Sequence, residues 1–243
     1  MRNVVWCSTV CGLTIGCGSV GHNNPADAAE PDAAPIDAAI DAPPDAPPDA
    51  ACEKTLLVGG VDVAGQGWII YQQQPEMITY GADYTQLTTS TTAMASSGGQ
   101  LLLARASSVA VDQPFKLEVV MQVVAISSHA DDTLDASAGI LGSLTGQVGS
   151  SSDRAEMVSM YPDRIVWADD AATHAVNIVD GAFHTYVLAV DAKRQASLSL
   201  DGAVILTRAS YVTNGTVAVG DQSNDAGLDA TTRIKQVRLL CVD

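Results

Sequence analysis

The sequence predicts an all-β fold: a jelly-roll sandwich of two antiparallel sheets, preceded by a disordered linker. Three observations predict it. After Cys52 the chain is a succession of short runs in which apolar and polar residues alternate, the pattern of strands with one buried face. Gly, Pro, Asn and Asp separate these runs, and tight turns favour these residues. No window of a dozen residues carries apolar side chains at helical spacing.

Composition and charge limit the domain count and the partners. The chain has 243 residues and a net charge of −16. Residues 1–51 differ so strongly in composition that the remainder, 52–243, is expected to form one domain. Both parts are acidic, whereas recognition of nucleic acid and of anionic membranes depends on clustered Lys and Arg. We therefore expect no nucleic-acid partner, and membrane contact only through an N-terminal lipid.

The N-terminus has the features of an export signal. Arg2 precedes a mostly apolar run over 4–15, which is too short for the roughly 20 residues that span a bilayer. The run ends in L-T-I-G-C and resembles the signal of bacterial lipoproteins, with the departure that Thr14 stands where that pattern prefers Leu. The resemblance implies a signal peptide over 1–16 and lipid attachment at Cys17. The alternative is an ordinary signal peptide with an incidental cysteine.

Residues 17–51 are rich in Asp, Ala and Pro, with an Asp at every fourth position from Asp37 to Asp49. Pro-Pro pairs exclude a helix, and the unbalanced negative charge favours an extended chain. We expect a disordered tether. Gly18 replaces the Asp that retains some lipoproteins in the inner membrane, so we expect an exported, lipid-anchored protein of the bacterial outer membrane.

The five cysteines divide into three groups. Cys7 and Cys11 lie in the predicted signal peptide, Cys17 would carry the lipid, and Cys52 and Cys241 flank the domain. Because an exported domain folds in an oxidising compartment, we expect a disulfide between the last two. Two reduced, buried cysteines are the alternative.

Expected strands follow in order along the domain. They cover 67–74, 76–81, 84–91, 100–107, 115–127, 138–144, 156–161, 164–169, 183–192, 196–200, 203–209, 216–221 and 232–242. The Asp-Gly pair at 201–202 predicts a two-residue hairpin turn. Pairing across it places Leu200 opposite Ala203 and Leu198 opposite Ile205.

A second hairpin is expected at the Y-P-D-R turn. Pairing across this turn places Met160 opposite Ile165 and Val158 opposite Trp167, which gives one apolar face and predicts that Trp167 belongs to the core. The opposite face carries the residues that we predict to contact a ligand: Ser159, Tyr161 and Arg164.

The stretches DGAFHTYVLAVDAKRQASLSLDGAVIL, TVAVGDQS and TRIKQVRLL resemble the second half of concanavalin A-like lectin/glucanase domains, the laminin-G-like jelly rolls. The shared features are a strand that begins with His184 and Tyr186, the Asp-Gly hairpin at 201–202, and a V-G-D strand at 219–221. This resemblance covers 180–241 and implies a jelly roll that binds glycan or extracellular matrix.

Glucanases of that family carry acidic residues on one strand in a pattern close to E-x-D-x-x-E. The four glutamates of the domain, Glu53, Glu76, Glu118 and Glu156, are far apart in the sequence, and the pattern is absent. We therefore expect no enzyme. A carboxyl pair assembled from distant strands, such as Glu118 with an aspartate, leaves glycoside hydrolysis as an alternative.

Laminin-G-like domains often hold calcium through loop aspartates, and we expect no other cofactor. The candidate calcium ligands are Asp131, Asp132 and Asp135, which fall in one expected loop and supply oxygen ligands. A solvated acidic loop without a metal is the alternative.

The sequence as a whole favours a non-catalytic binding or adhesion module, anchored at the cell surface, for glycan or matrix. One alternative is a structural envelope lipoprotein that contacts other surface proteins. The other is a divergent glycoside hydrolase.

Overall fold

A computed structural model of the chain describes residues 52–72, 78–89, 100–127, 138–142, 156–167, 172–223 and 229–242. These belong to one compact unit that begins at Asp45. The predicted signal peptide, lipid site and tether lie outside the described residues. Among those described, no helix is long and apolar enough to cross a membrane.

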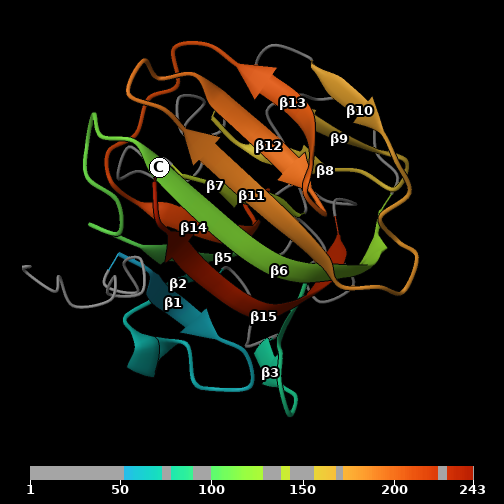
Figure 1. Cartoon of the computed structure of the whole chain (residues 1–243). Helices are drawn as coiled ribbons and strands as arrows, with labels where there is room; N and C mark the ends of the chain where they lie inside the picture. The colour runs from blue at the N-terminus through green and yellow to red at the C-terminus, as the bar shows by residue number, and fades with distance from the viewer. Residues whose placement is uncertain are drawn as a thin grey trace, which may run out of the picture. The chain divides into compact units, whose positions relative to one another are not determined.

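Two antiparallel sheets form the described domain, as the sequence predicts (Figure 1). Sheet A has the order β13-β12-β11-β6-β15-β4-β3, with β1 also paired to β15. Its strands are β1 (Lys54–Val58), β3 (Ile78–Tyr80), β4 (Thr85–Thr88), β6 (Phe115–Ile126), β11 (His184–Val190), β12 (Ala196–Leu200), β13 (Ala203–Arg208) and β15 (Ala230–Leu240).

Sheet B has the order β10-β9-β8-β7-β14-β5-β2. Its strands are β2 (Ile69–Gln72), β5 (Leu101–Arg105), β7 (Gly139–Leu141), β8 (Val158–Met160), β9 (Arg164–Trp167), β10 (Thr173–Ala175) and β14 (Val217–Asp221). A short 3-10 helix, η1 (Ala64–Gln66), joins β1 to β2.

The core lies between the sheets because successive residues of each strand point to opposite faces. On β11, Tyr186, Leu188 and Val190 are buried, while the residues between them face outward and are half-buried. Full burial of one large apolar side chain contributes about 1.5–3 kcal/mol relative to exposure. The alternating pattern therefore holds the two sheets together.

The Asp-Gly hairpin at 201–202 is present, with φ values of 49° and 86° at the two turn residues. Positive φ at both positions is typical of a type I′ turn, which matches the twist of the strands. Leu200 pairs with Ala203 as predicted, but the predicted partner of Leu198 is wrong. A register shift between Leu198 and Ser199 makes Leu206 the partner of Leu198. A bulge of this kind adds one residue to one strand.

The β8–β9 hairpin has the predicted register. Met160 pairs with Ile165 and Val158 pairs with Trp167. The Trp167 side chain is fully buried and contacts Tyr211 edge to face, with ring centroids 6.1 Å apart. Trp167 is therefore a core residue, as the pairing predicts.

Two strands, β1 and β10, lie where the sequence analysis expected none. β1 pairs with β15, and its buried residues, Leu56 and Leu57, are adjacent instead of alternating because the register shifts there. β10 is a three-residue edge strand paired with β9. Neither strand has the alternation on which sequence-based assignment depends.

A disulfide joins Cys52 and Cys241, which confirms the predicted pair. It links the start of β1 to the residue after β15, two strands that already pair. Because the bridge closes almost the whole domain into one loop, the entropy model gives about 5 kcal/mol of stabilisation.

His184 joins two turns at one end of sheet A. Its Nδ1 lies 2.7 Å from Asp201 Oδ2 and its Nε2 lies 3.2 Å from Asp180 Oδ1. The backbone N–H of Thr185 also donates to Asp201. Burial lowers the pKa of His184, but hydrogen bonds to Asp201 and Asp180 outweigh this, so the pKa is raised. The protonated ring can donate to both carboxylates at once, whereas the neutral ring has one donor.

Replacing His184 with Gln should lower the free energy of unfolding by about 0.5–1 kcal/mol near pH 5.5, where the ring is protonated and both carboxylates are ionised. The raised pKa means that this stabilisation disappears as the pH rises through the value of the folded state. Urea denaturation of both proteins at pH 5.5 and pH 9 measures the difference. A difference that stays constant over this range contradicts the role of the proton.

Candidate functional site

The structure brings the three predicted ligand residues to one place on the outward face of sheet B. Ser159 and Tyr161 are buried, and the Arg164 guanidinium carbon lies 4.0 Å from the centre of the Tyr161 ring. Arg164 Nη1 also donates to Asp163 at 2.8 Å. The three residues lie on one face of the sheet, as the predicted register requires. Their contact with a ligand stays a prediction.

The outward face of β8 and its flanking residues carries no acidic side chain. Met157, Ser159 and Tyr161 point outward, while Val158 and Met160 belong to the core. A glycosidase pair carried by this strand would need carboxylates on the outward face. This strand therefore cannot supply such a pair.

Glu156 is used for packing. It is buried, and its Oε2 lies 3.2 Å from Arg208 Nε on β13 of the other sheet. The Arg208 guanidinium lies 5.9 Å from the centre of the Trp167 ring. Removal of one partner would leave a buried charge, so the pair is a structural link between the sheets.

Glu118 lies on the outward face of sheet A and is paired with Arg238. Arg238 donates to both carboxylate oxygens of Glu118, with Nε at 2.6 Å and Nη2 at 3.2 Å. The hydrogen bond to Glu118 is the main cause of the raised pKa of Arg238. With both oxygens bound to a guanidinium, Glu118 is a poor choice as acid or base.

The predicted calcium ligands, Asp131, Asp132 and Asp135, lie outside the described residues. Within the described ranges, no group of three or more His, Cys, Asp and Glu could hold a metal ion. The metal prediction therefore stays untested.

Two carboxyl groups, one at the end of β14 and one just before β15, lie close enough for the charge of one to affect the other. Asp221 ends β14 and is buried, and Asp229 directly precedes β15. Thr89 Oγ1 donates to Asp221 Oδ2 at 2.7 Å, and Ser223 N donates to Oδ1 at 2.8 Å. Burial raises the pKa of Asp221 well above its usual value, the two hydrogen bonds oppose this, and the charge of Asp229 adds to it. Burial therefore makes the protonated form of Asp221 more favoured than that of an exposed aspartate.

A cavity of about 190 Å³ lies beside this pair. Its lining comes from the ends of β4, β6 and β15: Thr89, Ala125, Ile126, Ser127, Asp229, Ala230 and Thr231. Asp229 is held there by its backbone, because Ser127 N donates to its carbonyl at 2.8 Å and its own N–H donates to Ser127 Oγ at 3.2 Å. Hydroxyl groups beside a carboxyl can bind a polar ligand.

The residue after Asp221 is a buried glutamine. The Gln222 side chain is buried, and neither of its polar atoms has a hydrogen-bond partner in the described part of the chain. The carbonyl of Gln222 accepts from Gln100 Nε2 at 2.9 Å. A buried, unsatisfied amide requires an explanation, and a polar functional site is one of those known.

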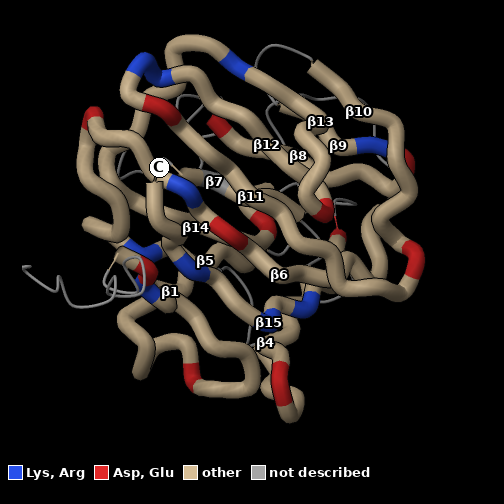
Figure 2. Tube along the Cα trace, in the orientation of Figure 1, with Lys and Arg blue, Asp and Glu red and all other residues tan. Residues whose placement is uncertain are grey.

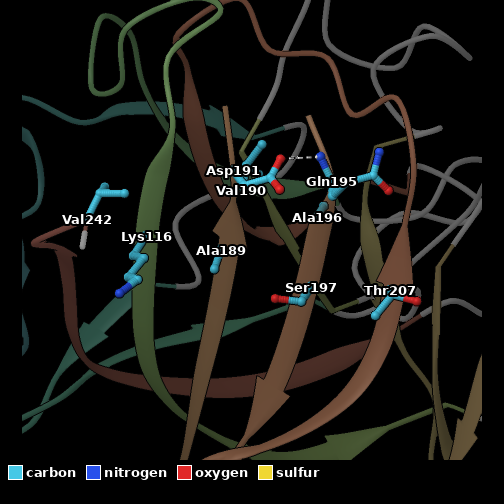
Figure 3. Close-up of a pocket in the computed structure, with 9 residues that line it drawn as sticks. All are labelled: Lys116, Ala189, Val190, Asp191, Gln195, Ala196, Ser197, Thr207 and Val242. Carbon is cyan, nitrogen blue, oxygen red and sulfur yellow. Dashed lines mark hydrogen bonds between the residues drawn. The ribbon is translucent and has the colours of Figure 1, made fainter. Parts of the chain in front are cut away.

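A larger but shallow depression lies on the outward face of sheet A (Figure 3). It has a volume of about 570 Å³, and four of its residues follow one row across β6, β11, β12 and β13: Lys116, Ala189, Ser197 and Thr207. The small side chains of the middle strands form its floor. Asp191 lies at its rim, and its carboxylate accepts hydrogen bonds from the backbone N–H groups of Lys193 and Gln195.

Sequence reasoning did not find the pair of Asp221 and Asp229. The V-G-D motif marked the first residue as part of a strand, and the second follows eight residues later, at the other end of the connection between β14 and β15. β14 belongs to sheet B and β15 to sheet A, so the two carboxyls lie where the chain passes from one sheet to the other. Such proximity depends on the packing of the layers.

Comparisons with known proteins support the fold. No protein-family model and no curated protein sequence matches the chain. A Crh5 transglycosylase in complex with NAG matches with a TM-score of 0.51 and 18% identity, over 80% of this chain and 86% of that one. A lichenase derived from a mouse hindgut metagenome matches with a TM-score of 0.51 and 8% identity, over 78% and 98% of the two chains.

An endo-1,3-β-glucanase from Streptomyces sioyaensis matches with a TM-score of 0.50 and 11% identity, over 82% of this chain and the whole of that one. At such identities the likeness establishes the concanavalin A-like sandwich. It also corrects our expectation that the chain is not an enzyme, because these matching proteins are glucanases and a transglycosylase. The absence of the E-x-D-x-x-E pattern from one strand was too narrow a criterion for excluding an enzyme.

Asp221→Asn should make stability less dependent on pH. Because the folded pKa of Asp221 is raised, the folded protein keeps a proton that the unfolded chain releases above about pH 4, so wild-type stability falls as the pH rises. Between pH 4.5 and pH 7.5 the wild type should lose more stability than the variant, by more than the roughly 0.5 kcal/mol of an ordinary surface substitution. Urea denaturation measures this, and equal slopes contradict the assignment.

Proposed function

We propose that this chain acts on a polysaccharide as a divergent glycoside hydrolase. The observation that supports the proposal most is the pair of Asp221 and Asp229 beside a hydroxyl-lined cavity. Two carboxyl groups in different environments are the requirement for acid and base chemistry at a glycosidic bond. Here one carboxyl ends β14 and the other directly precedes β15, in place of a motif on one strand.

The two carboxyls would have different roles. Asp229 lines the cavity and would remove a proton from the water whose oxygen bonds to the anomeric carbon. Asp221 is buried near Asp229 and has a raised pKa, so it would supply the proton that the leaving sugar oxygen takes as the glycosidic bond breaks. Thr89 and Ser223 fix the Asp221 carboxyl by donating to its two oxygens.

The matching solved structures give the proposal its substrate class. They are a transglycosylase in complex with NAG, an endo-1,3-β-glucanase and a β-1,3-1,4-glucanase. Proteins of this fold therefore include enzymes named for their action on polysaccharides. The test of the proposal uses polymers with several linkages.

Hydrolysis by the full chain should release reducing ends from at least one member of a panel of β-glucans, chitin oligomers and uronic-acid polymers. Asp229→Asn and Asp221→Asn should each lower the rate by about 100-fold or more, since positioned acids and bases contribute 10²–10⁴-fold. Asp112→Asn is the matched control, because Asp112 is exposed and distant in the sequence from Asp221 and Asp229. Asn also tolerates the φ of 58° at this position. No release from any polymer, or release unaffected by both variants, rejects the proposal.

We also propose that the chain is exported and anchored through Cys17. The disulfide between Cys52 and Cys241 supports an oxidising compartment. Expression in a Gram-negative host should place the protein in the outer-membrane fraction, and Cys17→Ser should move most of it to the soluble fraction, because the lipid is lost. Equal distribution of both proteins would reject the anchor.

A further inference from the structure

Arg233 occupies the middle of a cross-strand row on the outward face of sheet A. Its neighbours in the row are Gln86 on β4 and Gln122 on β6. Arg233 Nε donates to Gln86 Oε1 at 2.8 Å, and Nη1 donates to Gln122 Oε1 at 3.4 Å. Gln122 is fixed in turn, because its Nε2 donates to the carbonyl of Gly181 at 2.6 Å. Neutral amides therefore hold the guanidinium in a defined place.

Two aromatic rings lie beside it. The guanidinium carbon of Arg233 is 4.8 Å from the centre of the Tyr84 ring, and Lys235 Nζ is 4.4 Å from the centre of the Phe183 ring. The two ring centres are 6.5 Å apart. We call these four residues, all of them half-buried, the cation–aromatic patch. Figure 2 marks basic positions along β15 near the β4 label.

Arg233 differs from its neighbours in having no acidic partner. Lys235 lies 2.9 Å from Asp83, and Arg238 lies 2.6 Å from Glu118. Over the described ranges of the chain, Arg233 contacts the amides and the ring alone, and its Nη2 donates to nothing. A cation without a counter-ion is unexpected in a protein with a net charge of −16. Its charge and its remaining N–H groups are available to an external anion.

We propose that the cation–aromatic patch binds the carboxylate of a sugar acid, so that the polysaccharide substrate contains uronate units. A planar guanidinium presents forked N–H groups that match the two oxygens of a carboxylate. The rings of Tyr84 and Phe183 supply an apolar surface for the C–H face of a sugar ring. The inference rests on the proposed function, because it takes the ligand to be a glycan. It adds that this glycan contains acidic sugars.

The patch lies in line with the cavity. Thr231 and Arg233 alternate with the buried residues of β15, so they share its outward face, and Asp229 directly precedes this strand. Four residues of extended strand span about 13 Å. A glycan chain that lies along β15 could therefore place one unit at Asp229 and a later, acidic unit at Arg233.

Binding can be tested apart from turnover with the full chain carrying Asp229→Asn. Calorimetry with a galacturonate trimer and a mannuronate trimer should detect binding of at least one. Adding Arg233→Gln should weaken it by about tenfold or more, and Arg233→Lys should weaken it also, because Lys lacks the fork. Lys193→Gln removes an exposed charge elsewhere and should leave the affinity unchanged. The methyl ester of the bound trimer, which has the same rings without the charge, should bind at least about tenfold more weakly.

The outcomes separate this inference from the hydrolase. Binding of neither trimer, or equal binding of trimer and ester, overturns the inference, while release of reducing ends from neutral glucans would leave the hydrolase standing. Binding that depends on Arg233 without any turnover by the wild type supports the inference and counts against the hydrolase. If Arg233→Gln does not fold, the comparison of trimer with ester decides the matter, because it requires no substitution at Arg233.

Discussion

The antiparallel pairing of β6 with β15 is the interaction on which the rest of sheet A depends. β6 carries β11 on its other edge, and β15 carries β1 and β4 on its other edge. Both strands are long enough to serve several partners, and Figure 1 shows them side by side across the front of the domain. Residues of β15 or next to it include Asp229, Arg233, Arg238 and Cys241. The stability of the sheet and the proposed chemistry therefore share one strand.

Burial explains why one carboxyl of the proposed site differs from the others. Among the described residues, Asp180, Asp191 and Asp201 lie at turns, where they accept backbone N–H groups. Asp221 lies between the sheets, where the charged form is disfavoured, and its hydrogen bonds from Thr89 and Ser223 offset this only in part. A carboxyl with a raised pKa lowers stability above its usual pKa, and such shifts are found at functional sites more often than elsewhere.

Proteins that share a sandwich fold can carry their reactive groups on different surfaces of it. The outward side of β8 carries Met157, Ser159 and Tyr161, none of which can serve as an acid in glycoside hydrolysis. The carboxyls of the proposed site lie instead at the end of β14 and just before β15. Function on a common fold is decided by side chains at a site, so the fold and the reactive residues must be argued separately.

Local pattern and turn chemistry were sufficient to predict much of the fold. Alternation along β11, the Asp-Gly turn at 201–202 and the register of β8 with β9 depend on residues that are close in sequence, and each was predicted correctly. The disulfide followed from cysteine usage. β10 was missed because a short edge strand buries too little to alternate, and the partner of Leu198 was wrong because a bulge has no clear sequence signal.

The sequence by itself thus determined the sandwich, its main hairpins and the disulfide between Cys52 and Cys241. Only the tertiary structure decided which polar groups meet: Asp221 with Asp229, Arg233 with two amides, and Glu118 with Arg238. Periodicity specifies which face of a strand is buried, because that information is local. The partner of a side chain across two strands or two sheets depends on register and on the packing of layers, and residues far apart in the chain fix these jointly.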